Sequence, residues 1–177
     1  MTDIDSLIIS SNNQLLLSNN KIIIMGDNAN VDGAFWRFAP LLDQDVSVMI
    51  SRDCDSRLND KEFKAVQSWL NHPAQFHCMR DHVNHSFPPV LAGMWGCKND
   101  GILNPRWLFK YLQQFKNNKY GDDQNGLFNF YKMHSNLFLE HDDLQRFNGI
   151  KFPTYNPFTF GSFIGERITS EDKPGRL

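Results

Sequence analysis

The chain has 177 residues, a length that fits a single globular domain. Hydrophobic residues make up 41% and charged residues 21% of the chain, which excludes a disordered tail and a coiled-coil rod. Eighteen basic and twenty acidic residues give a formal net charge of −2, so no general positive field would draw the protein to nucleic acid.

The cysteine content and the N-terminal sequence favour a cytoplasmic protein. Three cysteines cannot pair into a closed set of disulfides, so we expect a reducing compartment. The first five residues carry two aspartates where a signal peptide needs positive charge. No apolar run approaches the ~18 residues that a membrane span requires. We therefore expect neither a membrane span nor a nucleic-acid partner.

The N-terminal part of the chain predicts a strand, a helix and a second strand. A β-branched apolar run at 21–25 is bounded by turn residues and indicates a buried strand, whereas residues 1–20 give no clear element. An aromatic segment at 33–42 precedes a second strand-like run at 46–51. In such a unit the loops after the strands form the ligand site, so residues 52–57 are expected on the functional edge.

Helices and strands alternate through the rest of the chain. Asn59 is a predicted N-cap, with Glu62 three positions later, for a helix that ends before Pro73 and buries Phe63 and Trp69. The remaining expected elements are a strand at 75–79, an apolar stretch at 90–96, helices at 105–115 and 122–134, a strand followed by a loop at 137–142, and an irregular cover at 152–177. This order predicts one α/β domain over residues 1–177.

Two carboxylates follow the strand predicted at 46–51. From this position Asp53 and Asp55 can both reach one divalent cation, which prefers hard oxygen ligands. Basic side chains nearby suit a phosphate or a diphosphate on that cation, because a guanidinium fork matches phosphate oxygens. These side chains are Arg37, Arg52 and Arg57. The alternative is a solvated acidic turn whose arginines pair with surface aspartates.

Two further polar clusters are open to more than one interpretation. Residues 79–85 form a loop dense in hydrogen-bonding side chains, which either binds a polar ligand or is solvated. Zinc binding is a weak alternative, because no Cys-x-x-Cys pair is present and alternation along a strand sends His77 and Cys78 to opposite faces. Its ligands would be Cys78, His77, His82 and His85, with Cys97 or Cys54 as a further one. Asp122 and Asp123 begin a predicted helix, where carboxylates stabilise the first turn without any ligand.

Several short motifs follow one another in an order more specific than the Asp-x-Asp pair alone. They are FWRF at 35–38, ISRDCDSRL at 50–58, MRDH at 79–82, GMWG at 93–96, DQ at 123–124, HD at 141–142 and FIGE at 163–166. This run resembles a family of small glycosyltransferase-like domains found in polysaccharide gene clusters and in large DNA viruses. The resemblance implies a GT-A-like three-layer α/β sandwich with a mostly parallel central sheet, followed after the Asp-x-Asp by a mixed acceptor-side half.

The resemblance also implies a metal site and a donor. Asp53 and Asp55 would bind a Mn²⁺ or Mg²⁺ that bridges the diphosphate of a nucleotide sugar, and Asp55 would be the more direct ligand. His141 would complete the metal site. The cation would offset charge on the departing nucleoside diphosphate. If the chain is viral, this chemistry would take place in the host cytoplasm.

Roles on the acceptor side follow from the same resemblance. The implied substrate-binding residues are Arg80, Asp81 and His82, which would hydrogen-bond sugar hydroxyls, and Gly93 and Trp95, of which the tryptophan would form an apolar platform for a pyranose. Asp123 would be the base that takes the proton of an acceptor hydroxyl on a glycan or glycoprotein. Such a base suits an inverting displacement.

The chain departs from this family at its N-terminus. A strand–helix–strand unit takes about 30 residues, so only one fits before Asp53, and we expect the domain to be N-terminally shortened. A catalytically inactive sugar-binding or assembly module is therefore an alternative to a glycosyltransferase. A phosphatase with an Asp-x-Asp nucleophile is a third possibility, although it would have Thr or Val where this chain has Arg57.

Overall fold

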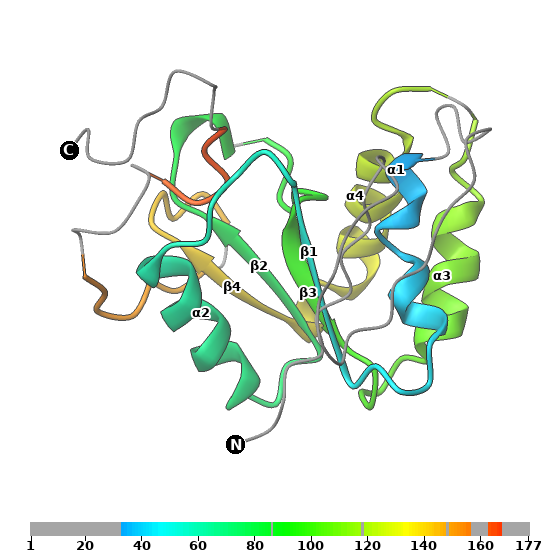
Figure 1. Cartoon of the computed structure of the whole chain (residues 1–177), viewed down its shortest axis with the longest axis horizontal. Coiled ribbons are helices and arrows are strands. Elements are labelled where there is room, and N and C mark those ends of the chain that lie inside the picture. Colours follow the sequence, from blue (N-terminus) through cyan, green and yellow to red (C-terminus); the bar gives the residue numbers. More distant parts are fainter. Residues whose placement is uncertain (1–32, 86, 118, 148, 157–162, 168–177) are drawn as a thin grey trace.

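The computed structural model describes residues 33–85, 87–117, 119–147, 149–156 and 163–167 (Figure 1). These residues form a mixed α/β structure around one open four-stranded sheet, which confirms the predicted α/β class. The strand expected at 21–25 and the poorly defined segment before it lie outside the described residues. So do residues 157–162 and 168–177 of the expected C-terminal cover.

The sheet is mixed. Its strands are β1 (Val48–Arg52), β2 (Phe76–Arg80), β3 (Met94–Lys98) and β4 (Phe138–Asp142), in the order β1-β3-β2-β4. Three of these strands run in one direction, but β3 lies between β1 and β2 and is antiparallel to both, so only the β2–β4 pairing is parallel. Among the described strands, the mostly parallel sheet expected from the sequence is therefore not found.

The reason for the mixed pairing lies in the connections. A parallel neighbour requires a crossover, usually a helix, and α2 (Asp60–Leu70) provides one between β1 and β2. Between β2 and β3 the chain has only a loop with the short η2 turn (Val83–His85), so β3 returns antiparallel. The carboxyl ends of β1, β2 and β4 consequently share one edge of the sheet, where open α/β sheets bind ligands.

Helices cover both faces of the sheet (Figure 1). On one face lies α2, whose Val66 and Trp69 pack against Leu139 of β4. On the other face lie α1 (Gly33–Trp36), η1 (Ala39–Leu42), α3 (Pro105–Gln113) and α4 (Asp122–His134). No helix in the described ranges is long and apolar enough to cross a membrane.

Strand alternation divides the side chains between the two layers. In β2, His77 stacks on Trp69 of α2 with ring centroids 5.2 Å apart, whereas Phe76 contacts Phe130 of α4. Cys78 lies on the same face as Phe76, so the structure separates His77 from Cys78 as alternation requires. All three cysteines of the chain are free thiols.

Local capping defines the helix starts. The Asn59 side chain accepts a hydrogen bond from Glu62 N–H at 2.9 Å, and the Asn104 side chain accepts one from Arg106 N–H at 2.9 Å. The predicted starts of α2 and α3 are thereby confirmed, as is the range of α4. The predicted buried face of α2 is wrong at Phe63, which is exposed, while Glu62 beside it is buried.

Candidate functional site at the carboxyl end of β1

Asp53 and Asp55 lie in a turn that follows β1 directly. The Asp53 backbone carbonyl accepts hydrogen bonds from the Ser56 N–H at 3.3 Å and from the Ser56 hydroxyl at 2.9 Å, which fixes the turn. The side chains of Asp53 and Asp55 are 51% and 49% exposed. Both carboxylates therefore reach the solvent.

Each of these carboxylates has an arginine from a distant part of the chain. Arg37 Nη1 lies 3.2 Å from Asp53 Oδ1, and Arg167 Nε lies 3.3 Å from Asp55 Oδ2. Arg37 Nε also lies 3.5 Å from Asp123 Oδ2 in the first turn of α4. Arg37 therefore joins Asp53 to Asp123, and the structure brings together three residues that the sequence predicts for metal, phosphate and base.

The segment before β3 lies beside the Asp53 carboxylate and is bonded to Gln124 of α4. The Gln124 amide donates to the Val90 carbonyl, and its Oε1 accepts from Ala92 N–H at 2.9 Å, so α4 is tied to the loop before β3. A Cβ added at Gly93 would lie 2.2 Å from Asp53 Oδ2. A side chain at position 93 would therefore displace the Asp53 carboxylate from its present position.

The partly buried Arg52 side chain is hydrogen-bonded to the turn that carries Asp53. Its guanidinium donates to the Gly93 carbonyl at 3.4 Å and to Ser56 Oγ at 3.2 Å. Its Nε lies 2.8 Å from Glu62 Oε1, and the Glu62 side chain is only 3% exposed. The Arg52 guanidinium thus supports the Asp53 turn, and its role in phosphate binding stays a prediction. Arg57 is exposed.

Glu62 makes the free energy of unfolding of the protein depend on pH. Burial raises the pKa of Glu62 from 4.5 to about 7, although Arg52 acts in the opposite direction. The unfolded chain ionises Glu62 near its ordinary value, so its contribution to stability is full below pH 4.5 and is lost as the pH rises through about 7.

We expect Glu62→Gln to remove this pH dependence, because glutamine does not titrate. The free energy of unfolding of the wild type should fall relative to the variant by about 3 kcal/mol between pH 4.5 and pH 8. Urea unfolding at several pH values measures the difference, with Asp100→Asn, at an exposed position, as the control. Parallel pH profiles for the wild type and Glu62→Gln would contradict the expectation.

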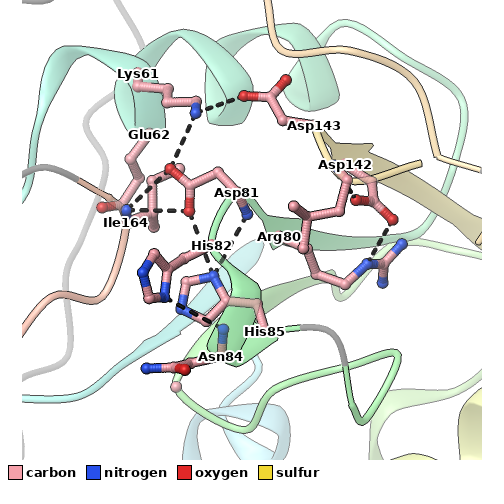
Figure 2. A network of polar contacts seen from close by, with 12 residues as sticks. Lys61, Glu62, Arg80, Asp81, His82, Asn84, His85, Asp142, Asp143 and Ile164 are labelled. Carbon is pink, nitrogen blue, oxygen red and sulfur yellow. Dashed lines mark hydrogen bonds and ion pairs between the residues drawn. The ribbon is translucent and has the colours of Figure 1, made fainter. Parts of the chain in front are cut away.

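Asp81 is the centre of a second polar cluster, at the carboxyl end of β2 (Figure 2). Its side chain is fully buried and lies 3.0 Å from Lys61 Nζ and 3.3 Å from His85 Nδ1. It also accepts the Ile164 backbone N–H at 3.1 Å, while Lys61 Nζ reaches Asp143 Oδ2 at 2.6 Å. Burial alone would raise the pKa of Asp81, but the contacts with His85 and Lys61 outweigh it and lower this pKa.

Of the residues expected to contact a sugar, Arg80 and Trp95 are buried and His82 is partly exposed. Arg80 is fully buried and pairs with Glu140 and Asp142 of β4, the latter at 3.0 Å. The His82 ring is stacked on Phe163 with centroids 3.9 Å apart. Trp95 lies in β3 with no exposed surface and packs against core aromatic side chains. Trp95 is thus part of the core, because β3 is an interior strand of the sheet and helices lie on both of its faces.

His141 does not join Asp53 and Asp55. It is fully buried, and its Nδ1 lies 2.8 Å from His77 Nε2. It belongs to β4, which is separated from β1 by three strand spacings, roughly 14 Å of sheet width. Burial lowers the pKa of His141 to about 4, and it lowers the pKa of His77 as well. The predicted completion of the metal site by His141 is therefore not supported by its position.

The remaining donors still fit a divalent cation bound together with a diphosphate. Two carboxylates on half-exposed side chains leave room for phosphate oxygens and water, the shell that Mg²⁺ commonly has in phosphate-binding sites. Within the described ranges, no group of three or more His, Cys, Asp or Glu residues is arranged to hold a metal ion.

Arg167 is a site residue that the motifs did not indicate. The sequence signal for it was only its place directly after the FIGE motif. Arg37 thus contacts both Asp53 and Asp123, and Arg167 contacts Asp55 of the same turn. Comparison of the chain with protein-family models, with curated proteins and with solved structures found no match.

Proposed function

We propose that the chain is a metal-dependent glycosyltransferase domain, which transfers a sugar from a nucleotide-diphosphate sugar to a hydroxyl group of a glycan or glycoprotein. The observation that carries this proposal is the position of Arg37 between Asp53 and Asp123. These residues come from three separate segments and meet at the sheet edge where ligands bind in open α/β folds. The mixed sheet that begins at the strand before Asp53 agrees with a GT-A-like acceptor half.

The donor side of the site consists of Asp53, Asp55 and Arg37. The two aspartates would hold Mn²⁺ or Mg²⁺, which when bound offsets the charge of the departing diphosphate. The Arg37 guanidinium suits phosphate oxygens because its planar fork can donate two parallel hydrogen bonds. A cytoplasmic location agrees with the free cysteines.

The acceptor side of the site is Asp123. In the proposed step the acceptor oxygen attacks the anomeric carbon while the bond from that carbon to the diphosphate oxygen breaks. The hydroxyl proton goes to the Asp123 carboxylate, and the products are a glycoside and a nucleoside diphosphate. A carboxylate in hydrogen-bond reach of the attacking hydroxyl can act as this general base. The Asp123 side chain is largely buried, and Arg37 holds it beside the Asp53 turn.

Binding of UDP and of GDP, measured by calorimetry with and without Mn²⁺, tests the proposal. We expect Mn²⁺-dependent binding of at least one of them by the wild type and by the exposed control Asp100→Asn. Asp55→Asn should weaken it at least about tenfold, because a charged ligand of the cation is lost. Turnover of the matching nucleotide sugars, followed as release of the nucleoside diphosphate, then tests transfer.

Each alternative has its own result in the same set of assays. Affinity for a glycan without any metal-dependent nucleotide binding would support an inactive sugar-binding or assembly module and would overturn the transferase proposal. Release of phosphate from generic phosphate esters would support a phosphatase instead. Equal nucleotide binding by the wild type and by Asp55→Asn would exclude Asp55 as a metal ligand.

A further inference from the structure

Residues 163–167, which we call the C-terminal strap, connect the Asp81 cluster to the Asp53 turn. The strap begins at Phe163, whose ring lies on His82, and continues with Ile164, which is fully buried. Ile164 belongs to a small hydrophobic cluster with Met79 of β2 and Met94 of β3. The strap is thereby packed onto the carboxyl-end edge of the sheet beside the proposed site.

The Asp81 carboxylate accepts a backbone N–H of the strap. Both oxygens of this buried carboxylate lie within 3.2 Å of the Ile164 N–H (Figure 2). A buried charge is costly unless it is paired and hydrogen-bonded, and here Lys61 and His85 provide the other contacts. Asp81 of the MRDH motif thus fixes the strap, which lies more than 80 residues later in the chain.

The other end of the strap reaches the Asp55 carboxylate. Gly165 has a φ of 77°, a left-handed conformation that glycine adopts without strain, and the chain turns there. Arg167 then forms an antiparallel bridge with Ser56, and its guanidinium lies 3.3 Å from Asp55. Arg167 pairs with Asp55, and Arg37 pairs with Asp53, so each aspartate of the turn has one guanidinium beside it.

We propose that Arg167 is a ligand of the donor diphosphate and that the Asp81 cluster positions it through the strap. This inference rests on the proposed function. The Arg167 side chain is 79% exposed, and an exposed ion pair is weak, so a divalent cation would displace it from Asp55 easily. The displaced guanidinium is then next to a cation that carries phosphate oxygens, for which its fork is suited. Arg37 and Arg167 would bind the diphosphate from two sides.

Calorimetry on the full chain tests this with two probes, Mn²⁺ alone and inorganic pyrophosphate in saturating Mn²⁺. We expect Arg167→Gln to weaken pyrophosphate binding roughly tenfold, because a charge-assisted contact is lost. The same change should leave Mn²⁺ affinity unchanged or increase it, because Asp55 loses a competing partner. A purely structural role of Arg167 would instead weaken both. Arg106→Gln, on the exposed surface of α3, is the matched control.

The role of the strap is tested by combining variants. Asp81→Asn should weaken pyrophosphate binding, and Arg167→Gln should have little further effect in that background, because two changes in one linked unit are not additive. If Asp81→Asn does not fold, Phe163→Ala takes its place, because it removes the ring contact with His82. Full additivity of the two changes would overturn the positioning role.

The outcomes separate this inference from the proposed function. If Asp55→Asn abolishes Mn²⁺-dependent pyrophosphate binding and Arg167→Gln stays within twofold of the wild type, the role of Arg167 is overturned and the metal site stands. If the wild type binds no pyrophosphate in the presence of Mn²⁺, both proposals fail.

Discussion

Asp123→Asn is expected to lower the rate of sugar transfer by roughly 10²- to 10⁴-fold, the usual contribution of a general base. Asparagine has nearly the same shape but cannot take the proton of an acceptor hydroxyl. Binding of the metal and the nucleoside diphosphate should persist, because Asp123 contacts the donor side only through Arg37. Turnover at saturating donor, together with calorimetry, measures the two effects separately.

The neighbouring residue provides the control for this experiment. The Asp122 carboxylate accepts the backbone N–H groups of Asn117 at 2.7 Å and of Lys119 at 3.0 Å, so it fixes the turn that leads into α4. Asp122→Asn keeps an accepting oxygen and should leave turnover almost unchanged. Equal losses of turnover in Asp122→Asn and Asp123→Asn would show that the helix start, and not a base, is what the reaction needs.

Arg80→Met is expected to destabilise the fold by about 3–5 kcal/mol, the cost of breaking a buried ion pair from one side. Arg80 donates to the Glu140 and Asp142 carboxylates, and both acids are buried in β4. Methionine fills part of the volume but leaves two buried negative charges without their cation. Urea unfolding at pH 7 measures the loss, and the exposed Arg106→Met is the control.

A loss of less than about 1 kcal/mol in Arg80→Met would contradict the role assigned to these two ion pairs.

The helices of this fold could be predicted because their signals are local. Asn59 and Asn104 cap helices within three residues of their own position, and those contacts are present in the structure. The strand ranges were also largely predictable. The direction of β3 was not, because strand pairing depends on partners such as Met49 and Cys97, which are far apart in the sequence.

The site could be predicted only in part. The place of Asp53 directly after a strand could be predicted, but no local pattern tells whether Trp95 or Arg80 in a strand faces a ligand or the core. Arg80 is satisfied by acids about 60 residues away, which the sequence does not place beside it. Arg167 was missed for the same reason, since only the folded strap brings it to Asp55.

A crystal soaked with Mn²⁺ and a nucleoside diphosphate, measured by the anomalous scattering of manganese, tests the central claim most directly. The account predicts a manganese peak about 2.2 Å from a carboxylate oxygen of Asp53 or Asp55. It also predicts that diphosphate oxygens complete the shell and that Arg37 is turned to the phosphates. Manganese bound elsewhere, with both aspartates still paired to Arg37 and Arg167, would contradict it.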